Sequence, residues 1–252
     1  MPASRPILVV TGGSRGIGAA VCRRAATEGY DVAVNYQSDA NAAAQVVQDC
    51  QGAGVRAIAV QGDMASEADV IQLFRAVDGD LGPVTHLVNN AGITGPVGKL
   101  VDADPAVIRT CIDLNVTGAI LVAQEAIKRM AKRHGGKGGA IVNVSSAAVT
   151  LGAPNLFVWY AASKGAIDSL TAGLAIELAP DGIRVNGVQP GMIDTEIHAK
   201  SSHDAGRLAR TLPAIPMQRA GTPDEVARTI LFLLSDASAY TTGAIVRVGG
   251  GR

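Results

Sequence analysis

Several absences in the composition narrow what this chain of 252 residues can be. Aromatic residues make up only 3% of it while hydrophobic residues reach 48%, so its core has to be built from alanine, valine, isoleucine and leucine. An excess of charge is also missing, since 22 basic residues balance 22 acidic ones without a basic stripe or a polybasic run. Nucleic acid and membrane surfaces are therefore not expected as partners.

Cysteine is scarce, and long apolar runs are missing. Cys22, Cys50 and Cys111 are odd in number, lie far apart and form no CxxC pair, so the sequence predicts neither a disulfide framework nor a metal site. No stretch reads as a signal peptide or a membrane span. Small core thiols in a reducing compartment fit this pattern, and we expect a cytoplasmic protein.

The hydrophobic pattern alternates between short runs typical of strands and longer runs at helical spacing. Strands are predicted at 7–10, 32–35, 57–60, 86–89, 140–144, 184–188 and 245–248, and helices at 16–28, 40–53, 67–78, 105–133, 160–179 and 223–234. Pro105 and Pro223 read as first-turn prolines behind the N-caps Asp104 and Thr222. The alternation predicts an α/β fold, a doubly wound parallel sheet of about seven strands with helices on both faces. No linker interrupts it, so residues 1–252 are expected to form a single Rossmann-type domain.

A glycine-rich turn follows the first predicted strand. Gly12, Gly16 and Gly18 have the spacing GxxxGxG rather than the stricter GxGxxG, and a helix follows them. Such glycines let the backbone approach a pyrophosphate at a helix N-terminus, although a plain tight turn would look similar. The same stretch also satisfies GxSxG around Ser14, the nucleophile pattern of α/β hydrolases. A serine hydrolase is the weaker alternative, because none of the four histidines stands out as a base.

The second predicted strand lacks the acid that binds the adenosine ribose in NAD-dependent proteins. It ends at Asn35 and Tyr36, and Asp39 comes late enough to cap the next helix instead. Arg15, inside the glycine turn, is placed to neutralise a 2′-phosphate. The sequence therefore favours NADP(H), with NAD(H) possible, and Tyr36 is a candidate to stack on adenine.

Tyr160 and Lys164 stand four residues apart in a predicted helix, which places the phenol and the ammonium on one face. A free tyrosine has a pKa of about 10 and is a poor proton donor at neutral pH. A neighbouring positive charge favours the phenolate, so we expect Lys164 to lower the pKa of Tyr160 toward the working range.

Taken in order, these motifs resemble those of the short-chain dehydrogenase/reductase family from end to end, closest to bacterial 3-oxoacyl-carrier-protein reductases and glucose-dehydrogenase-like members. The matching marks are Thr11-Gly12 with Gly16-Ile17-Gly18, Asn89-Asn90-Ala91-Gly92, Asn115 within 114–118, Ser145-Ser146, Tyr160 with Lys164, and Pro190-Gly191. The resemblance implies hydride transfer between a nicotinamide and a carbonyl or alcohol carbon of a small-molecule substrate.

The resemblance also implies a role for each matching residue. Tyr160 would be the general acid/base, Lys164 would hold the nicotinamide ribose, Ser146 would bind the substrate oxygen and Asn115 would anchor a water. Cofactor contacts are implied for Gly12, Ser14, Arg15, Gly16, Ile17, Gly18, Asn35, Tyr36, Asp63, Met64, Asn89, Ala91, Gly92, Tyr160, Lys164, Pro190, Gly191, Ile193 and Thr195. A substrate lid at about 192–216 and a homotetramer are further expectations.

One departure concerns the substrate. Ser146 precedes Tyr160 by one residue more than in many members of the family, and the extra residue falls in 151–159. This segment is expected to form an apolar wall of the substrate pocket through Leu156, Phe157 and Trp159, although Trp159 suits core packing equally well. The substrate is therefore not transferred by analogy. A catalytically silent NADP-binding regulator is the alternative to an enzyme.

Overall fold

We describe a computed structural model of the chain over residues 5–195 and 212–252. Seven parallel strands form one sheet in the order β3-β2-β1-β4-β5-β6-β7, which confirms the predicted doubly wound architecture. The strands are β1 (Ile7–Val10), β2 (Asp31–Tyr36), β3 (Ala57–Gln61), β4 (His86–Asn89), β5 (Gly139–Val144), β6 (Ile183–Pro190) and β7 (Ile245–Val248). The strand order reverses between β1 and β4, and in open α/β sheets ligands bind at the carboxyl ends of the strands at such a point.

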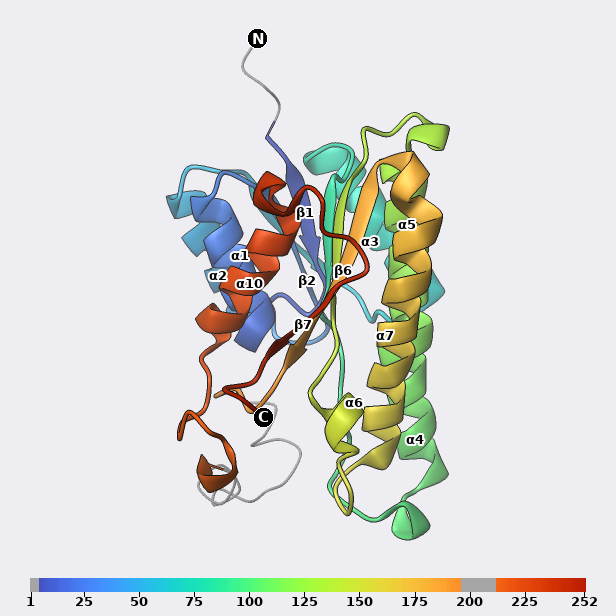
Figure 1. Cartoon of the computed structure of the whole chain (residues 1–252). Helices are drawn as coiled ribbons and strands as arrows, with labels where there is room; N and C mark the ends of the chain where they lie inside the picture. Colours follow the sequence, from blue (N-terminus) through green and yellow to red (C-terminus); the bar gives the residue numbers. More distant parts are fainter. Residues whose placement is uncertain (1–4, 196–211) are drawn as a thin grey trace.

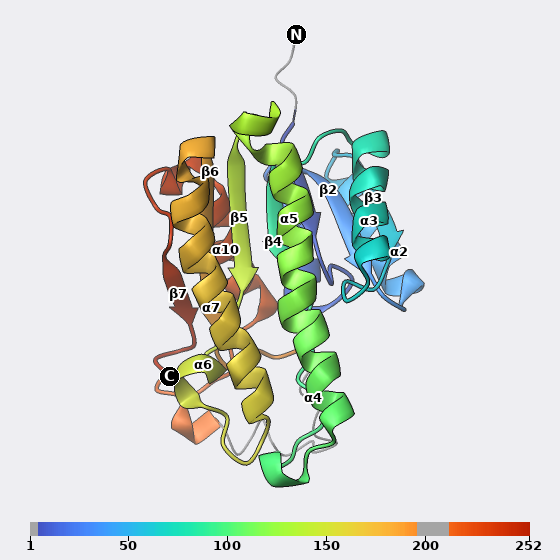
Figure 2. The same ribbon diagram turned by 90° about the vertical axis from the view of Figure 1, so that its right-hand side faces the viewer.

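Helices cover both faces of the sheet, as the edge-on view shows (Figure 1). On one face lie α1 (Gly16–Thr27), α2 (Ala40–Gly52) and α10 (Pro223–Leu234). On the other face lie α3 (Glu67–Asp80), α5 (Ala119–Met130) and α7 (Val158–Leu178), with α4 (Pro105–Ile112) continuing α5 beyond the sheet (Figure 2). The short helix α6 (Ala148–Leu151) and the 3₁₀ turns η1 (Leu100–Asp102), η3 (Lys132–His134), η4 (Ala179–Asp181), η5 (Leu212–Ala214) and η6 (Asp236–Ser238) complete the described elements.

The core has two halves because the strands bury side chains on both of their faces. In β1, Leu8 and Val10 pack with α1 and α10, while Ile7 and Val9 pack with α3 and α5. All four are buried, as expected for a central parallel strand. The three cysteines are free and buried, in agreement with their predicted role as small core residues.

Helix starts follow the predicted caps. The Asp104 side chain accepts a hydrogen bond from the Ala106 amide, and Asp39 accepts one from Ala42. Thr222 and Glu225 form a reciprocal capping box at the start of α10. Because each cap satisfies an amide that the helix leaves open, the sequence locates these boundaries closely.

The predicted helix 105–133 ends at Met130 instead, and it contains a π-helical turn. The chain forms α4, then a π-helical turn η2 (Asp113–Gly118), then α5, and helical geometry stops at Met130. A Cβ atom at Gly118 would clash with the carbonyl oxygen of Met64, so the glycine lets this helix pass directly against the loop after β3. Single π turns inside α-helices often occur at functional sites.

This same stretch bears on the expected absence of a membrane span. Within residues 5–195 and 212–252, Pro105–Met130 is the one helix long and apolar enough to cross a membrane by length and composition. Its inner side packs against the sheet through Val122, Ala126 and Met130. A helix that covers a hydrophobic core gives the same pattern, so the finding is weak evidence for a span.

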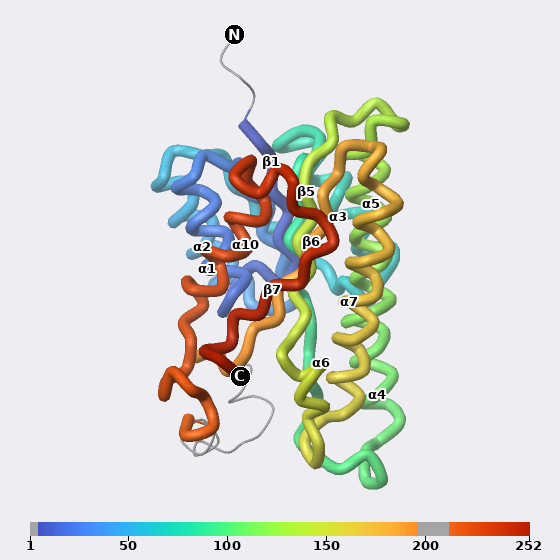
Figure 3. The backbone as a smooth tube through the Cα atoms, viewed as in Figure 1, coloured from blue at the N-terminus to red at the C-terminus, as the bar shows by residue number. Residues whose placement is uncertain are grey.

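The tail after β7 turns back below the sheet, as the backbone trace shows (Figure 3). The Met217 amide donates a hydrogen bond to the Gly250 carbonyl at 3.1 Å, and Gly251 packs on Pro216. The C-terminal tail therefore packs against Pro216 and Met217, which precede α10. Of the predicted lid at 192–216, residues 196–211 lie outside the described part of the chain, including His198 and His203.

Candidate active site

Glycine shapes the loop between β1 and α1. Gly12 and Gly16 have φ angles of 62° and 52°, in the left-handed region that glycine reaches without strain. A Cβ atom at Gly18 would clash with the Gly12 carbonyl oxygen, so nothing larger fits on that side of α1. The backbone can approach a ligand closely here, as the glycine spacing predicts.

The N-terminus of α1 has the features of an anion site. Its cap residue, Arg15, makes no side-chain capping hydrogen bond, and the first turn holds no acidic residue. The first amides of a helix are hydrogen-bond donors, and the helix dipole favours negative charge beside them. A cavity of about 700 Å³ opens at this point and is lined by Ser14, Gly16 and Ile17. The cradle fits the pyrophosphate of a dinucleotide.

Most of the predicted cofactor residues line this first cavity. They are Gly12, Ser14, Arg15, Gly16, Ile17, Asn35, Tyr36, Asp63, Met64, Ala91, Gly92 and Thr195. Gly18 and Asn89 are not among its lining residues. Gly18 acts through close packing, and Asn89 donates its side-chain amide to the Ala119 carbonyl at 2.8 Å, which ties β4 to α5.

Asn35 lines the cavity, but both ends of its side-chain amide form hydrogen bonds within the protein. Its Oδ1 accepts from the Gly12 amide at 3.1 Å, and its Nδ2 donates to the Gly62 carbonyl at 3.0 Å. The side chain is 2% exposed. Asn35 therefore fixes the glycine loop relative to β3, and this contact explains why an amide stands where an acid is usual.

The far end of this cavity combines one cation with two carboxylates. The Arg15 guanidinium lies 3.5 Å from the Asp39 carboxylate. Asp39 caps α2, as predicted, and Asp63 accepts a hydrogen bond from Gln37 at 2.9 Å. Tyr36 is half-buried at the end of β2. Among the described residues that line this cavity, Arg15 is therefore the one with a positive charge, and it lies near the end of β2, where the acid typical of NAD-binding proteins is absent.

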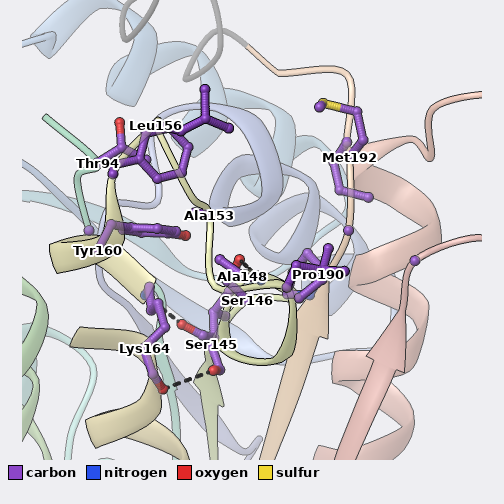
Figure 4. A pocket seen from close by; sticks show the side chains of 18 of the residues that line it. Thr94, Ser145, Ser146, Ala148, Ala153, Leu156, Tyr160, Lys164, Pro190 and Met192 are labelled. Carbon is purple, nitrogen blue, oxygen red and sulfur yellow. Dashed lines mark hydrogen bonds between the residues drawn. The ribbon is translucent and has the colours of Figure 1, made fainter. Parts of the chain in front are cut away.

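A second cavity of about 370 Å³ adjoins the first at the carboxyl ends of β5 and β6 (Figure 4). It collects nine predicted site residues, Ile17, Gly92, Ser146, Tyr160, Lys164, Pro190, Gly191, Ile193 and Thr195. Ile17, Asn90, Gly92, Thr94 and Thr195 line both cavities. The inner end of the first cavity is therefore the floor of the second.

The side chains of Tyr160, Ser146 and Lys164 come from two elements that meet at this cavity. Tyr160 and Lys164 stand on successive turns of α7, and Ser146 follows β5. The Lys164 ammonium lies 5.8 Å from the centre of the Tyr160 ring and donates to the Val144 carbonyl at 2.7 Å. Lys164 is 4% exposed, so the sheet end and α7 enclose its charge.

The electrostatics of this pair differ from the expectation for Tyr160. Burial raises the pKa of Tyr160, and the interaction with the Ser146 side chain opposes that rise. Burial also lowers the pKa of Lys164 to about 8. In the protein without cofactor, burial therefore opposes the expected lowering of the Tyr160 pKa.

Asn115 lies behind these residues, in the π turn. Its Oδ1 accepts from the Ile93 amide at 2.8 Å, while its Nδ2 donates to the Ile93 carbonyl and to Ser163 Oγ. A Cβ atom at Gly92 would lie 3.1 Å from Asn115 Oδ1 and 3.3 Å from Lys164 Nζ. Asn115 is thus close to Lys164 but lines neither cavity, and its side chain joins the loop after β4 to α7.

The predicted apolar wall is present, with one exception. Leu151, Ala153 and Leu156 line the second cavity together with Phe157. Trp159 does not line it; the indole is 5% exposed and donates to the Thr94 carbonyl at 2.8 Å. Core packing, the other interpretation of Trp159, is the one that the structure favours.

The segment with the extra residue has an uncommon backbone. Ala153 and Asn155 adopt φ angles of 47° and 59°, next to Gly152 at 70°. Left-handed conformations are costly for residues other than glycine and collect at functional sites. The segment that carries the extra residue is therefore a tight loop, and Ala153 within it lines the second cavity.

Sequence reasoning did not assign several lining residues. Thr94 lines both cavities, and Ile215 and Arg252 line the second. The carboxyl-terminal arginine lies more than a hundred residues from Ser146 in sequence, and the tail turn brings it to the pocket. Thr94 lies two residues after the Asn89–Gly92 motif, and this proximity is the signal in the sequence that could have identified it.

The hydrolase alternative finds no support in the described part of the chain. Ser14 lines the first cavity, but no histidine lines either cavity. His86 lies at the opposite end of its strand, where burial lowers its pKa to about 4. Among the described residues that line the two cavities, Ser14 therefore has no histidine to act as its base.

Comparison with known proteins supports the same conclusion. Residues 12–252 match the family model described as enoyl-(acyl carrier protein) reductase. The uncharacterized oxidoreductase YgfF of Escherichia coli strain K12 is 49% identical over 246 residues, covering 98% of this chain and 99% of its own.

Two solved structures with bound cofactors are similar over nearly all of the chain. A short chain dehydrogenase from Burkholderia cenocepacia in complex with NADP has a TM-score of 0.89 and 35% identity, covering 98% of this chain and 97% of its own. A 3-ketoacyl-(acyl-carrier-protein) reductase from Brucella melitensis complexed with NADH has a TM-score of 0.90 and 31% identity, covering 98% of both chains. With its family marks, fold and relatives in agreement, the chain belongs to the short-chain dehydrogenase/reductase family of oxidoreductases.

Proposed function

We propose that this protein is an NADP(H)-dependent oxidoreductase that interconverts a carbonyl group and a secondary alcohol, with Tyr160 as general acid/base. The observation that carries the proposal is the convergence of Tyr160, Ser146 and Lys164 on an apolar cavity that shares its floor with the dinucleotide cavity. A bound nicotinamide supplies or accepts the hydride. The protein supplies the proton, the orientation of the substrate and the exclusion of water.

Each of the three side chains has a separate task in this proposal. In reduction, the Tyr160 phenol donates its proton to the substrate oxygen; the raised pKa keeps this proton in place at neutral pH. The Ser146 hydroxyl donates a hydrogen bond to the same oxygen and stabilises the charge that develops there. The Lys164 ammonium holds the ribose beside the nicotinamide and stabilises the phenolate that remains.

The preference for NADP(H) rests on the charges at the end of β2. An acid is missing at Asn35 and Tyr36, and Arg15 lines the same cavity. A guanidinium pairs readily with a phosphate in a bidentate way, so Arg15 is the proposed partner of the 2′-phosphate. Cofactor-bound structures similar to this chain include both an NADP and an NADH complex, so kinetics with both cofactors are needed to test the preference.

We further propose a cytoplasmic homotetramer. Ile176 on α7 is 81% exposed and Ile120 on α5 is 44% exposed, and the two helices lie side by side on one face (Figure 2). Gly173 adds a place on α7 where a Cβ atom would meet nothing within 4 Å. Packing of this face against a second copy would bury these side chains.

The proposal is tested by cofactor oxidation with a panel of ketones, diketones, quinones, sugar lactones and 3-oxoacyl thioesters. We expect turnover with NADPH, and a loss of roughly 10²- to 10⁴-fold in Tyr160→Phe, which removes the proton donor. NADPH binding, measured by fluorescence, should survive the substitution. Tyr240→Phe, the same chemical change at a fully exposed position, is the matched control and should retain full activity.

Each other outcome has a definite meaning. Full activity in Tyr160→Phe would contradict the assignment of the general acid. NADPH binding without turnover across the panel would favour a silent NADP-binding regulator.

A further inference from the structure

A polar cluster lies beneath the catalytic helix, one turn beyond Lys164. Asp168 follows Lys164 by four residues on α7, so the two side chains share a helix face with about 5–6 Å between their Cβ atoms. Asp168 Oδ2 accepts from Gln189 Nε2 at 2.6 Å. Gln189 is 6% exposed and is the residue before Pro190 on β6. None of these contacts belongs to the proposed proton transfer itself.

The cluster continues to the surface through Arg247 on β7. The Arg247 guanidinium donates to Gln189 Oε1 at 2.7 Å and to Thr150 Oγ1 at 2.6 Å. Thr150 belongs to α6, next to Leu151 in the wall of the substrate cavity. Four elements, α7, β6, β7 and α6, are thereby joined by a chain of side-chain hydrogen bonds that ends at the Asp168 carboxylate.

The Asp168 carboxylate is incompletely satisfied. Its Oδ1 is enclosed and has no hydrogen-bond partner among the described residues. Buried acceptors normally have a donor, and leaving one without a partner is unfavourable. This carboxylate lies on the face of α7 that also carries the buried Lys164 ammonium, one helical turn away.

The groups around Lys164 affect its protonation. Burial disfavours its ammonium, and the groups that act in the opposite direction are Cys111 on α4 and Asp168. Burial raises the pKa of the Cys111 thiol, so at neutral pH it contributes no negative charge. Tyr160 is also neutral there, β5 presents only the Val144 carbonyl, and the Arg247 charge lies beyond the neutral Gln189.

We infer that Asp168 is a positioning residue that keeps Lys164 protonated in the pH range of the reaction, and that Gln189 and Arg247 hold its carboxylate in place. The functional consequence rests on the proposed role of Lys164. The protonation of Lys164 is a property of the protein alone and can be measured without turnover.

The test is a direct titration of Lys164. The chain contains only six lysines, so protein labelled with ¹³C at the lysine ε carbon gives a simple spectrum, and Lys164→Arg assigns the resonance. We expect a wild-type midpoint near pH 8, and a midpoint lower by about one pH unit in Asp168→Asn, which has nearly the same shape without the charge. An unchanged midpoint would overturn the inference.

Arg247→Gln is the matched control within the cluster. It removes the outer link while the charge of Asp168 remains, so the Lys164 midpoint should stay or rise. A fall equal to that of Asp168→Asn would show that general disruption of the cluster is responsible, and would overturn the inference. Should Asp168→Asn fail to fold, Asp168→Ser removes the same charge.

A pH–rate profile separates this inference from the proposed function. In Asp168→Asn the loss of activity at high pH should begin at lower pH than in the wild type, in step with the titration. A uniform loss at every pH would mean that Asp168 is only structural. If the wild-type protein turns over no substrate at any pH, the proposed function fails, while the Lys164 midpoints still decide the inference.

Discussion

Protonation of individual residues is what distinguishes this site from an ordinary apolar pocket. Burial pushes the pKa of Tyr160 up and that of Lys164 down to about 8, so both groups are driven toward their neutral forms. For Tyr160 this preserves the proton that reduction requires. For Lys164 it is a cost, and the surrounding charge has to offset it.

The proposed preference for NADP(H) can be tested at a single residue. Arg15→Gln removes the proposed partner of the 2′-phosphate, so we expect the KM for NADPH to rise about tenfold, or about 1.4 kcal/mol, with little change for NADH. Steady-state kinetics with both cofactors measure this.

The control for Arg15 is Arg23→Gln, the same charge change on the same helix, where Arg23 pairs with Asp49 instead. It should alter neither KM. A preference for NADH in the wild type would contradict both the proposed role of Arg15 and the NADP(H) preference inferred from the absence of an acid at the end of β2.

Residue types at fixed spacing predict some of these roles and not others. Tyr160 and Lys164 can be placed together because four residues make one helical turn. The bracing role of Asn35 could not be predicted, since its partners Gly12 and Gly62 come from two different loops. The burial that raises the Tyr160 pKa in the protein without cofactor could not be predicted either, because desolvation depends on the side chains that surround the ring.

At the scale of elements, strand and helix positions follow from hydrophobic period and caps, and most bounds agree within two residues. The interruption of 105–133 could not be predicted, because a π turn leaves the apolar pattern unbroken. Its cause is contact between Gly118 and the loop at Met64, which brings together segments from different parts of the chain.

The start of α10 gives a pH-dependent test of an element. Arg219 and the Thr222 amide hydrogen-bond the Glu225 carboxylate and lower its pKa to about 2. A lowered carboxyl pKa stabilises the fold above the unfolded pKa of about 4.3, and the contribution is lost as the pH falls toward 2. Glu225→Gln should therefore lower the Tm at pH 7, and its difference from wild type should shrink between pH 4.3 and 2.

Thr222→Ala is the companion variant for this helix start. It removes the other half of the capping box without removing a charge, at about 1 kcal/mol. Its cost should persist at low pH. A Glu225→Gln difference that stays constant across the same range would refute the assigned cause.

At the scale of the whole molecule, the proposed homotetramer can be tested by substitution on the exposed face of α7. Ile176→Glu places a charge on the exposed face of α7, and in the proposed tetramer it should break the contact between copies. Light scattering during gel filtration should give four times the chain mass of 25.6 kDa for the wild type, and less for the variant. Val101→Glu, at 87% exposure on η1, is the control and should leave the mass unchanged. A monomeric wild type would contradict the proposed assembly.

The floor shared by the two cavities has a kinetic consequence. Ile17, Gly92 and Thr195 belong to both, so the substrate cavity is complete only after the inner end of the first is filled. We therefore expect ordered binding, in which the dinucleotide enters first and leaves last. Product-inhibition patterns should accordingly be competitive between the oxidised and reduced dinucleotides, and mixed for every other pair of reactants.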